Sequence, residues 1–281
     1  MKNNLPIYYM IYSVIAFTIM YTIVTSLNRF SVYQIVFFRA IGTLSLTIPL
    51  ILKQKIPILG NNKKLLLLRA ILGVFSMTLF FQSIKYLGVG ISVSIRYLSP
   101  LFATIFALIF LKEKVKLIQW FFILLALLGV FLINGFEQNI SSVGILFALL
   151  SAITVGLIFV ITSKIGNSEN TLVIVNYFMI LTLIFGASTS FNYWINPNLK
   201  ELFLLLLSGV FGFIAVFYMT KSFQNIKINI VAPIKYLEVV FAVIIGFFYF
   251  GERYTVWTFL GILLILVSII NSFYFRNKSS S

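Results

Sequence analysis

Four ionisable side chains lie inside long apolar stretches of this sequence: Arg39, Arg96, Lys235 and Glu238. A charge within an apolar membrane segment is costly unless it is paired or reaches water, so each of the four is a candidate functional residue. Glu238 follows Lys235 by three residues, which places both on one face of a helix. Two interpretations remain open: an ion pair that neutralises both charges, or a carboxyl group that takes up a proton or exchanges Lys235 for a solute amine.

A tyrosine directly follows two of these cations, giving Arg96-Tyr97 and Lys235-Tyr236. An aromatic face, a hydroxyl group and a cation together can hold a planar or zwitterionic solute. The alternatives are that the long cationic side chains extend to the lipid headgroups and that the tyrosines belong to an interfacial aromatic belt.

Several kinds of chemistry are excluded because the residues for them are missing. The chain has no His, no Cys and no Asp, so zinc sites, thiol chemistry and imidazole bases are excluded. No phosphate-binding GxxxxGK[ST] loop is present, which argues against direct use of ATP. We expect no enzymatic activity, no catalytic residue, no metal site and no cofactor.

Composition indicates a membrane protein. Of 281 residues, 61% are hydrophobic and 10% are charged, and the mean hydropathy is +1.08, whereas a soluble domain has about 25% charged residues. One membrane span needs about 20 apolar residues. Ten stretches qualify: 7–27, 31–52, 65–87, 91–111, 117–133, 143–165, 172–191, 202–223, 230–250 and 256–275.

The 21 Lys and Arg residues, against 6 acidic ones, indicate the orientation. This excess alone would also suit a nucleic-acid-binding protein, but the cations lie in short linkers between apolar stretches. With the N-terminus inside, 14 cations, Arg69 among them, lie on the inner side and 4 on the outer side. The positive-inside rule therefore predicts ten spans with both termini in the cytoplasm, and no nucleic-acid partner.

The chain also repeats itself at an offset of 139 residues. Arg96 then aligns with Lys235, Tyr97 with Tyr236, and Glu113 with Glu252. The offset covers five spans, an odd number, so the second half must cross the membrane in the opposite sense. We expect an all-α membrane protein built from two inverted-topology repeats, 1–134 and 142–276, as is common in transporters.

Other polar and proline positions complete this interpretation. Gln82 aligns with Lys221 in the repeat and can face the same cavity. Pro100 is expected to kink its span, whereas Pro233, near a span end, is expected to matter less. Glu113 and Glu252 end their spans beside Lys or Arg, which suggests turn contacts. The expected substrate-binding residues are Arg39, Gln82, Arg96, Tyr97, Lys235, Tyr236 and Glu238.

The motifs FFRA (37–40), LLRAILGVFSMTLFFQSIKYLGV (67–89), RYLSPLFATIFALIFLKEKV (96–115) and APIKYLEVVFAVIIGFFYFGER (232–253) make the chain similar to the drug/metabolite transporter superfamily, in its EamA-like branch. Tyr254 departs from the proline that the family often has after the GER turn. The resemblance implies a ten-helix carrier with two repeats around a central cavity, which moves small organic metabolites.

From these observations we expect a secondary transporter in the cytoplasmic (inner) membrane. Three intramembrane cations against one acid favour a small amphiphilic solute with an anionic group, foremost an amino acid or derivative, moved by alternating access in export or exchange. A proton or a counter-substrate is a further candidate partner. The alternatives are an uptake exchanger for a nucleoside-type metabolite or vitamin, similar to S-adenosylmethionine or riboflavin, and a lipid flippase.

Overall fold

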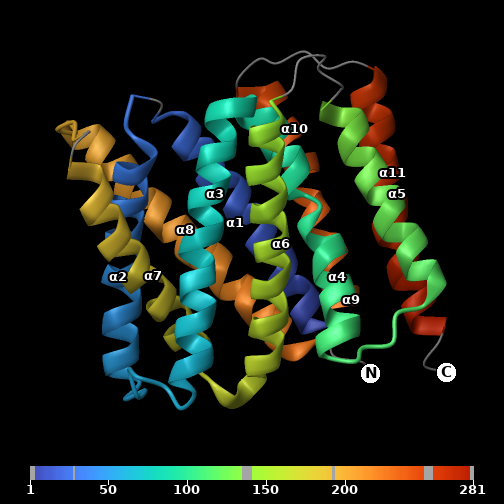
Figure 1. Cartoon of the computed structure of the whole chain (residues 1–281), viewed down its shortest axis with the longest axis horizontal. Helices are drawn as coiled ribbons and strands as arrows, with labels where there is room; N and C mark the ends of the chain where they lie inside the picture. The colour runs from blue at the N-terminus through green and yellow to red at the C-terminus, as the bar shows by residue number, and fades with distance from the viewer. Residues whose placement is uncertain (1–3, 28, 135–140, 192–193, 250–255, 279–281) are drawn as a thin grey trace. The chain divides into compact units, whose positions relative to one another are not determined.

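The computed structural model describes residues 4–27, 29–134, 141–191, 194–249 and 256–278, and every regular element in these ranges is helical (Figure 1). Glu252, Arg253 and Tyr254 lie outside them. The helices are α1 (Leu5–Thr25), α2 (Val32–Lys53), α3 (Lys63–Arg96), α4 (Ser99–Phe110), α5 (Leu117–Asn134), α6 (Ser142–Ile165), η1 (Gly166–Ser168), α7 (Thr171–Ser190), α8 (Leu199–Asn225), α9 (Ile228–Val231), η3 (Ala232–Tyr236), α10 (Leu237–Tyr249) and α11 (Val256–Lys278).

Six helical segments of the described chain are long and apolar enough to cross a membrane: Leu5–Thr25, Val32–Lys53, Lys63–Ser83, Ser142–Ser168, Thr171–Ser190 and Leu199–Asn225. They match six of the ten predicted spans. Local sequence signals set some of their ends. Ser31 accepts a hydrogen bond from the backbone amide of Gln34 (3.2 Å) at the start of α2, as expected of an N-cap serine.

The predicted spans 65–87 and 91–111 do not separate at residue 88, because α3 continues to Arg96. A straight helix would hold Phe80 and Arg96 about 24 Å apart. The guanidinium carbon of Arg96 nevertheless lies 4.1 Å from the centre of the Phe80 ring. The helix therefore doubles back between them, as Figure 1 shows at the upper end of α3, and the chain then breaks at Tyr97 and Leu98 before α4.

The predicted span 230–250 is likewise interrupted. The chain forms the short helix α9, then the 3₁₀ segment η3, and only then the helix α10. Pro233 lies at the start of η3, where proline fits because it lacks a backbone donor. Pro233 was expected to matter less because it lies near a span end; the structure places it at the start of η3, and its importance stays a prediction. Pro100, expected to kink its span, instead lies at the start of α4, just after the other break.

The described chain divides into two compact units, which we describe separately. Unit 1 comprises Met1–Val74 and Ile165–Asn225, and unit 2 comprises Phe75–Lys164 and Ile226–Ser281. In unit 1, α1 packs on α8, and α2 packs on both α7 and α8. In unit 2, α5 packs on α11, and α4 contacts α9 and η3. Each unit thus combines helices from both predicted repeats.

Contacts that the 139-residue offset relates occur in both units. In unit 1 the Ser13 hydroxyl donates to the carbonyl of Ala215 (2.7 Å), and in unit 2 the Ser151 hydroxyl donates to the carbonyl of Ser76 (3.0 Å). Ala215 follows Ser76 by 139 residues, and Ser151 follows Ser13 by 138. The same donor and acceptor roles therefore recur at equivalent helix crossings.

Candidate functional site

Five of the seven predicted site residues gather in unit 2, at the two helix breaks. Arg96 ends α3 and Tyr97 lies in the gap before α4, while Lys235 and Tyr236 end η3 and Glu238 lies in the first turn of α10. We call these five residues the break cluster. Discontinuous helices expose backbone groups that regular helices hide, and transporters commonly place solute sites at such points.

Lys235 and Glu238 form the centre of the break cluster. The Lys235 ammonium donates to Oε1 of Glu238 in a salt bridge, and the two residues are 8% and 4% exposed. This is the ion pair that the three-residue spacing predicts. Lys235 is held within the helix packing and is not extended toward a surface, which speaks against the headgroup interpretation for this residue.

Arg96 adds a further positive charge to the pair. Its guanidinium lies over the Phe80 ring, close enough for its charge to act on both Lys235 and Glu238. The three side chains together carry a net charge of about +1 in their ordinary ionisation states. The cluster is therefore electrostatically suited to a solute with one anionic group.

The two tyrosines approach each other across the breaks. The ring centres of Tyr97 and Tyr236 are 6.2 Å apart, and Tyr236 is fully buried against residues of α5, α10 and α11. The Tyr236 hydroxyl has no hydrogen-bond partner among the described residues. An unpaired buried hydroxyl costs about 1–3 kcal/mol, so this group is poised to bind a polar atom from outside the protein.

The other two predicted residues lie elsewhere. Arg39 belongs to unit 1, where its Nε faces Gly212 of α8: a Cβ atom at Gly212 would lie 2.8 Å from it. Gln82 lies in unit 2, two residues after Phe80 and half-buried. Residues two apart do not share a helix face, and no described contact joins Gln82 to the break cluster.

A family model matches the two sequence halves of the chain separately. The model of the EamA-like transporter family matches residues 4–135 and again residues 142–274. The chain belongs to this family.

Several characterised relatives of this EamA-like transporter are similar over most of their length. The S-adenosylmethionine uptake transporter of Rickettsia bellii is 25% identical, over 90% of this chain and 88% of that protein. Solute carrier family 35 member G1 of Mus musculus is 29% identical, over 94% and 77%. The pseudopaline exporter CntI of Pseudomonas aeruginosa is 27% identical, over 84% of each.

One crystal structure of another protein superposes with a TM-score of 0.88 over 98% of this chain and 99% of that one, at 13% identity. At this level of identity the likeness concerns the fold alone. Fold, family and apolar helices together make the chain a multi-pass membrane transporter.

Arg69 is a buried cation that was not among the predicted site residues. It was counted with the cations of the inner side, within the predicted span 65–87, and in the structure it is 2% exposed with its guanidinium over the Phe178 ring at 5.1 Å. Arg69 and Arg39 share a local pattern of two large apolar residues before the arginine and an alanine after it. That shared pattern was the available signal, because it groups Arg69 with Arg39, which was a predicted site residue.

Unit 1 contains an open polar pocket of about 600 Å³ near the end of α8. Its lining residues are Gln54, Asn167, Glu169, Asn170, Thr171, Leu172, Phe217, Lys221, Gln224 and Asn225. None of the seven predicted site residues lines it. Nor does the described part of the chain contain three His, Cys, Asp or Glu residues grouped to hold a metal ion.

Proposed function

We propose that this EamA-like protein is a secondary transporter that moves a small amphiphilic metabolite, foremost an amino acid or a derivative, across the cytoplasmic membrane. The proposed transporter has ten spans in two inverted repeats, 1–134 and 142–276, with both termini in the cytoplasm. It works by alternating access, in export or exchange, with a proton or a counter-substrate as the coupled species.

Two observations support the inverted repeats. The family model matches the chain twice, in stretches close to the proposed boundaries. Helices that the offset relates also contact each other within the units: α2 contacts α7, and α5 contacts α11. Such pairing is the arrangement expected when two similar halves exchange roles about an axis in the membrane plane.

The observation that carries the solute site is the break cluster. It combines a buried ion pair, a nearby guanidinium and an unpartnered tyrosine hydroxyl at two helix breaks. Replacing a buried ion pair by apolar residues is often neutral or stabilising. The pair is therefore better explained by a function than by the needs of the fold.

The chemistry of the cluster indicates the solute class. A zwitterionic amino-acid group offers a carboxylate to Arg96 or Lys235 and an ammonium group to Glu238. Tyr97 and Tyr236 supply aromatic surface for the apolar part of the solute. Within this scheme Glu238 exchanges Lys235 for the solute amine, or takes up a proton, during the cycle.

Relatives support both directions of transport. The Pseudomonas aeruginosa relative is an exporter, whereas the Rickettsia bellii relative takes up S-adenosylmethionine. S-adenosylmethionine itself carries an amino-acid group, so an uptake exchanger for such a nucleoside-type metabolite is the second candidate. A riboflavin-like vitamin and a lipid flippase rank below it, because the buried charges of the break cluster suit a zwitterion better.

The test is counterflow in proteoliposomes with an unbiased set of solutes. Vesicles preloaded with unlabelled small-molecule extract are placed in a ¹³C-labelled extract, and the labelled metabolites that accumulate are identified by mass spectrometry. We expect one compound or a small group of related compounds with an amino-acid group.

The matched control is the double variant Lys235→Met/Glu238→Leu, which replaces the ion pair with apolar residues of similar size. It should remain folded and accumulate no more label than protein-free vesicles. Equal accumulation by the parent and the double variant would move the solute site away from the break cluster, and no accumulation by either would remove the transport proposal for this class.

A further inference from the structure

A second polar contact in unit 2 joins the loop after α4 to the start of α9. Oε1 of Glu113 accepts a hydrogen bond from the backbone amide of Ile228 (3.3 Å). The side-chain amide of Asn229 donates to Oε1 of Gln119 (3.1 Å), which also accepts from the amide of Lys116 (2.8 Å). We call Glu113, Gln119, Ile228 and Asn229 the clasp.

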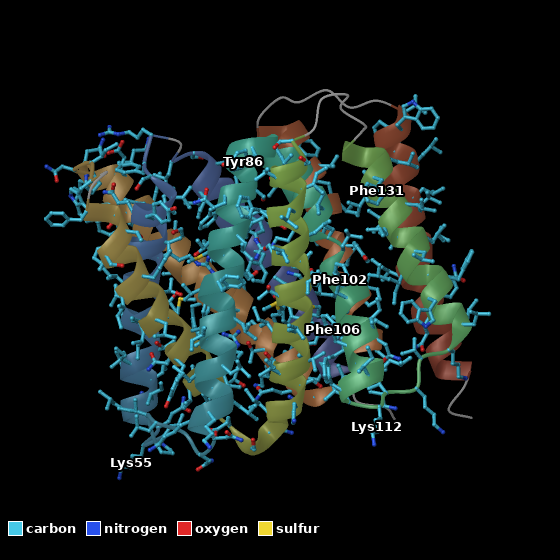
Figure 2. The ribbon with its side chains drawn as sticks, viewed as in Figure 1. Lys55, Tyr86, Phe102, Phe106, Lys112 and Phe131 are labelled. Atoms are coloured by element: carbon cyan, nitrogen blue, oxygen red, sulfur yellow. The ribbon has the colours of Figure 1, made fainter. Side chains whose placement is uncertain are left out.

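The backbone fixes Glu113 in the clasp. Lys112, labelled at the lower end of α4 in Figure 2, has φ 53°, in the left-handed region. A left-handed residue commonly ends a helix by turning the chain back on its last carbonyls. Accordingly, the amide of Glu113 bonds to the carbonyl of Ala107 (3.2 Å). The direction of the Glu113 side chain is thus set by the end of α4.

Two acceptor atoms of the clasp have no partner among the described residues. They are Oε2 of Glu113 and Oδ1 of Asn229, both buried. An ionised carboxylate only accepts hydrogen bonds, whereas a protonated one also donates one. A proton on Glu113 would therefore give the carboxyl group a donor for the side-chain oxygen of Asn229, the residue next to its Ile228 partner. A proton shared between the two oxygens would satisfy both.

The electrostatics of the clasp point the same way. Burial raises the pKa of Glu113 above its usual value, although the amides of Ile228 and Asn229 and the charge of Lys227 oppose the shift. From the segment that faces Glu113, the charge that acts on it is Lys227, just before α9. Three further lysines lie with Glu113 on the loop after α4: Lys112, Lys114 and Lys116. Desolvation outweighs the two amides and Lys227.

We propose that the clasp is a proton-binding site: Glu113 is protonated in the folded protein and donates to Asn229 Oδ1, locking the start of α9 to the loop after α4. The proton joins a carboxylate oxygen, and no other bond changes. Six residues lie between Asn229 and Tyr236, through α9 and η3. The clasp therefore holds the near end of the interrupted helix that carries Lys235. It does so whether or not Lys235 binds a solute.

The chain is suited to a direct test because it contains six Glu and no Asp. Infrared spectra of the purified protein at a series of pH values report the C=O stretch of protonated carboxyl groups. The pH dependence of the melting temperature reports how proton binding is linked to the stability of the fold. If the pKa of Glu113 is higher in the folded than in the unfolded protein, the carboxyl group stabilises the fold at pH values below its unfolded-state pKa. This stabilisation is lost as the pH rises through its folded-state pKa. The wild-type melting temperature should fall over that window.

Glu113→Gln should remove the Glu113 band and flatten the pH dependence, because the glutamine amide donates to Asn229 at every pH. Asn229→Ala should move the titration to lower pH, because the acceptor of the proton is gone.

Glu201→Gln is the control: it removes a carboxyl group that is paired with Arg29 in unit 1, and it should leave the titration unchanged. Should Glu113→Gln not fold, Glu113→Asp serves, since it shifts the frequency of this band alone.

Three results would overturn the proposal. The first is a spectrum in which Glu113→Gln, or Glu113→Asp in its place, leaves every protonated-carboxyl band unaltered. The second is an Asn229→Ala variant that titrates like the wild type. The third is stabilisation that follows sodium concentration at fixed pH, with choline as the control ion, because a metal cation and not a proton would then bridge the two oxygens.

Discussion

The two units differ in the helix breaks and the buried ion pair that only unit 2 shows among the described residues. In unit 1, α2 and α8 approach so closely that a Cβ atom at Gly209 would lie 2.6 Å from the backbone oxygen of Arg39. Hydroxyl groups add bonds between helices there, such as Thr43 to the carbonyl of Gly209 (2.8 Å). Unit 2 has close contacts of the same kind, since a Cβ atom at Gly129 would lie 2.6 Å from the backbone oxygen of Gly261. In addition, two of its helices are broken, and charged side chains are buried at the breaks.

This difference separates packing from function. Small residues let continuous helices come together and stabilise a membrane protein through close contact. Broken helices and a buried ion pair contribute little to stability on their own account. Unit 1 should therefore respond to substitution mainly through folding, and the break cluster of unit 2 mainly through transport.

The largest effect is expected at the ion pair of unit 2. Lys235→Met leaves the Glu238 carboxylate buried without its partner and should lower the free energy of unfolding by about 3–5 kcal/mol. Lys235→Met/Glu238→Leu should recover most of this loss. Denaturant titration in detergent micelles measures both. Equal destabilisation by the single and double variants would mean that the pair is structural, and the contrast between the units would fail.

The second effect is expected at the close contact between α2 and α8 in unit 1. Gly209→Ala should lower the free energy of unfolding by about 1–3 kcal/mol, because the added methyl group meets backbone atoms that cannot yield. Solute exchange per folded molecule should be unchanged. Gly166→Ala is the control: Gly166 has φ 52° and open space around it, so only the left-handed backbone is penalised, by about 1 kcal/mol. A smaller loss at Gly209 than at Gly166 would contradict the close packing.

The smallest effect concerns the repeat. Ser13→Ala and Ser151→Ala each remove one interhelical donor at equivalent crossings, and each should lower the free energy of unfolding by about 1 kcal/mol. Ser188→Ala, at an exposed hydroxyl that bonds within its own helix, is the control and should have less effect. Markedly different losses at Ser13 and Ser151 would weaken the equivalence of the two crossings.

Apolar length and periodicity made most of the architecture predictable. Six predicted spans appear as long helices, and the Lys235–Glu238 pair follows from helical spacing alone. The helix breaks were not predictable in detail. A stretch such as 230–250 is apolar enough to span, and only tertiary packing decides whether Pro233 bends it or interrupts it.

Burial of individual charges was the other weak point. Hydropathy cannot show whether a cation in the first turns of a span extends to the surface or is buried. Arg69, within the predicted span 65–87, was therefore counted only as an inner-side cation, although it lies buried over Phe178. Glu113 was expected to make only turn contacts for the same reason. Its partner, the amide of Ile228, lies 115 residues away in the chain, and no local pattern reveals it.

The central claim, that a solute binds at the break cluster of unit 2, is tested most directly by Tyr236→Phe, with stability and exchange measured on one preparation. The change removes only the buried hydroxyl that lacks a partner among the described residues. We predict that the free energy of unfolding rises by about 1 kcal/mol, while counterflow of the accumulated metabolite falls at least tenfold. An equally fast or faster exchange in the variant would contradict the account.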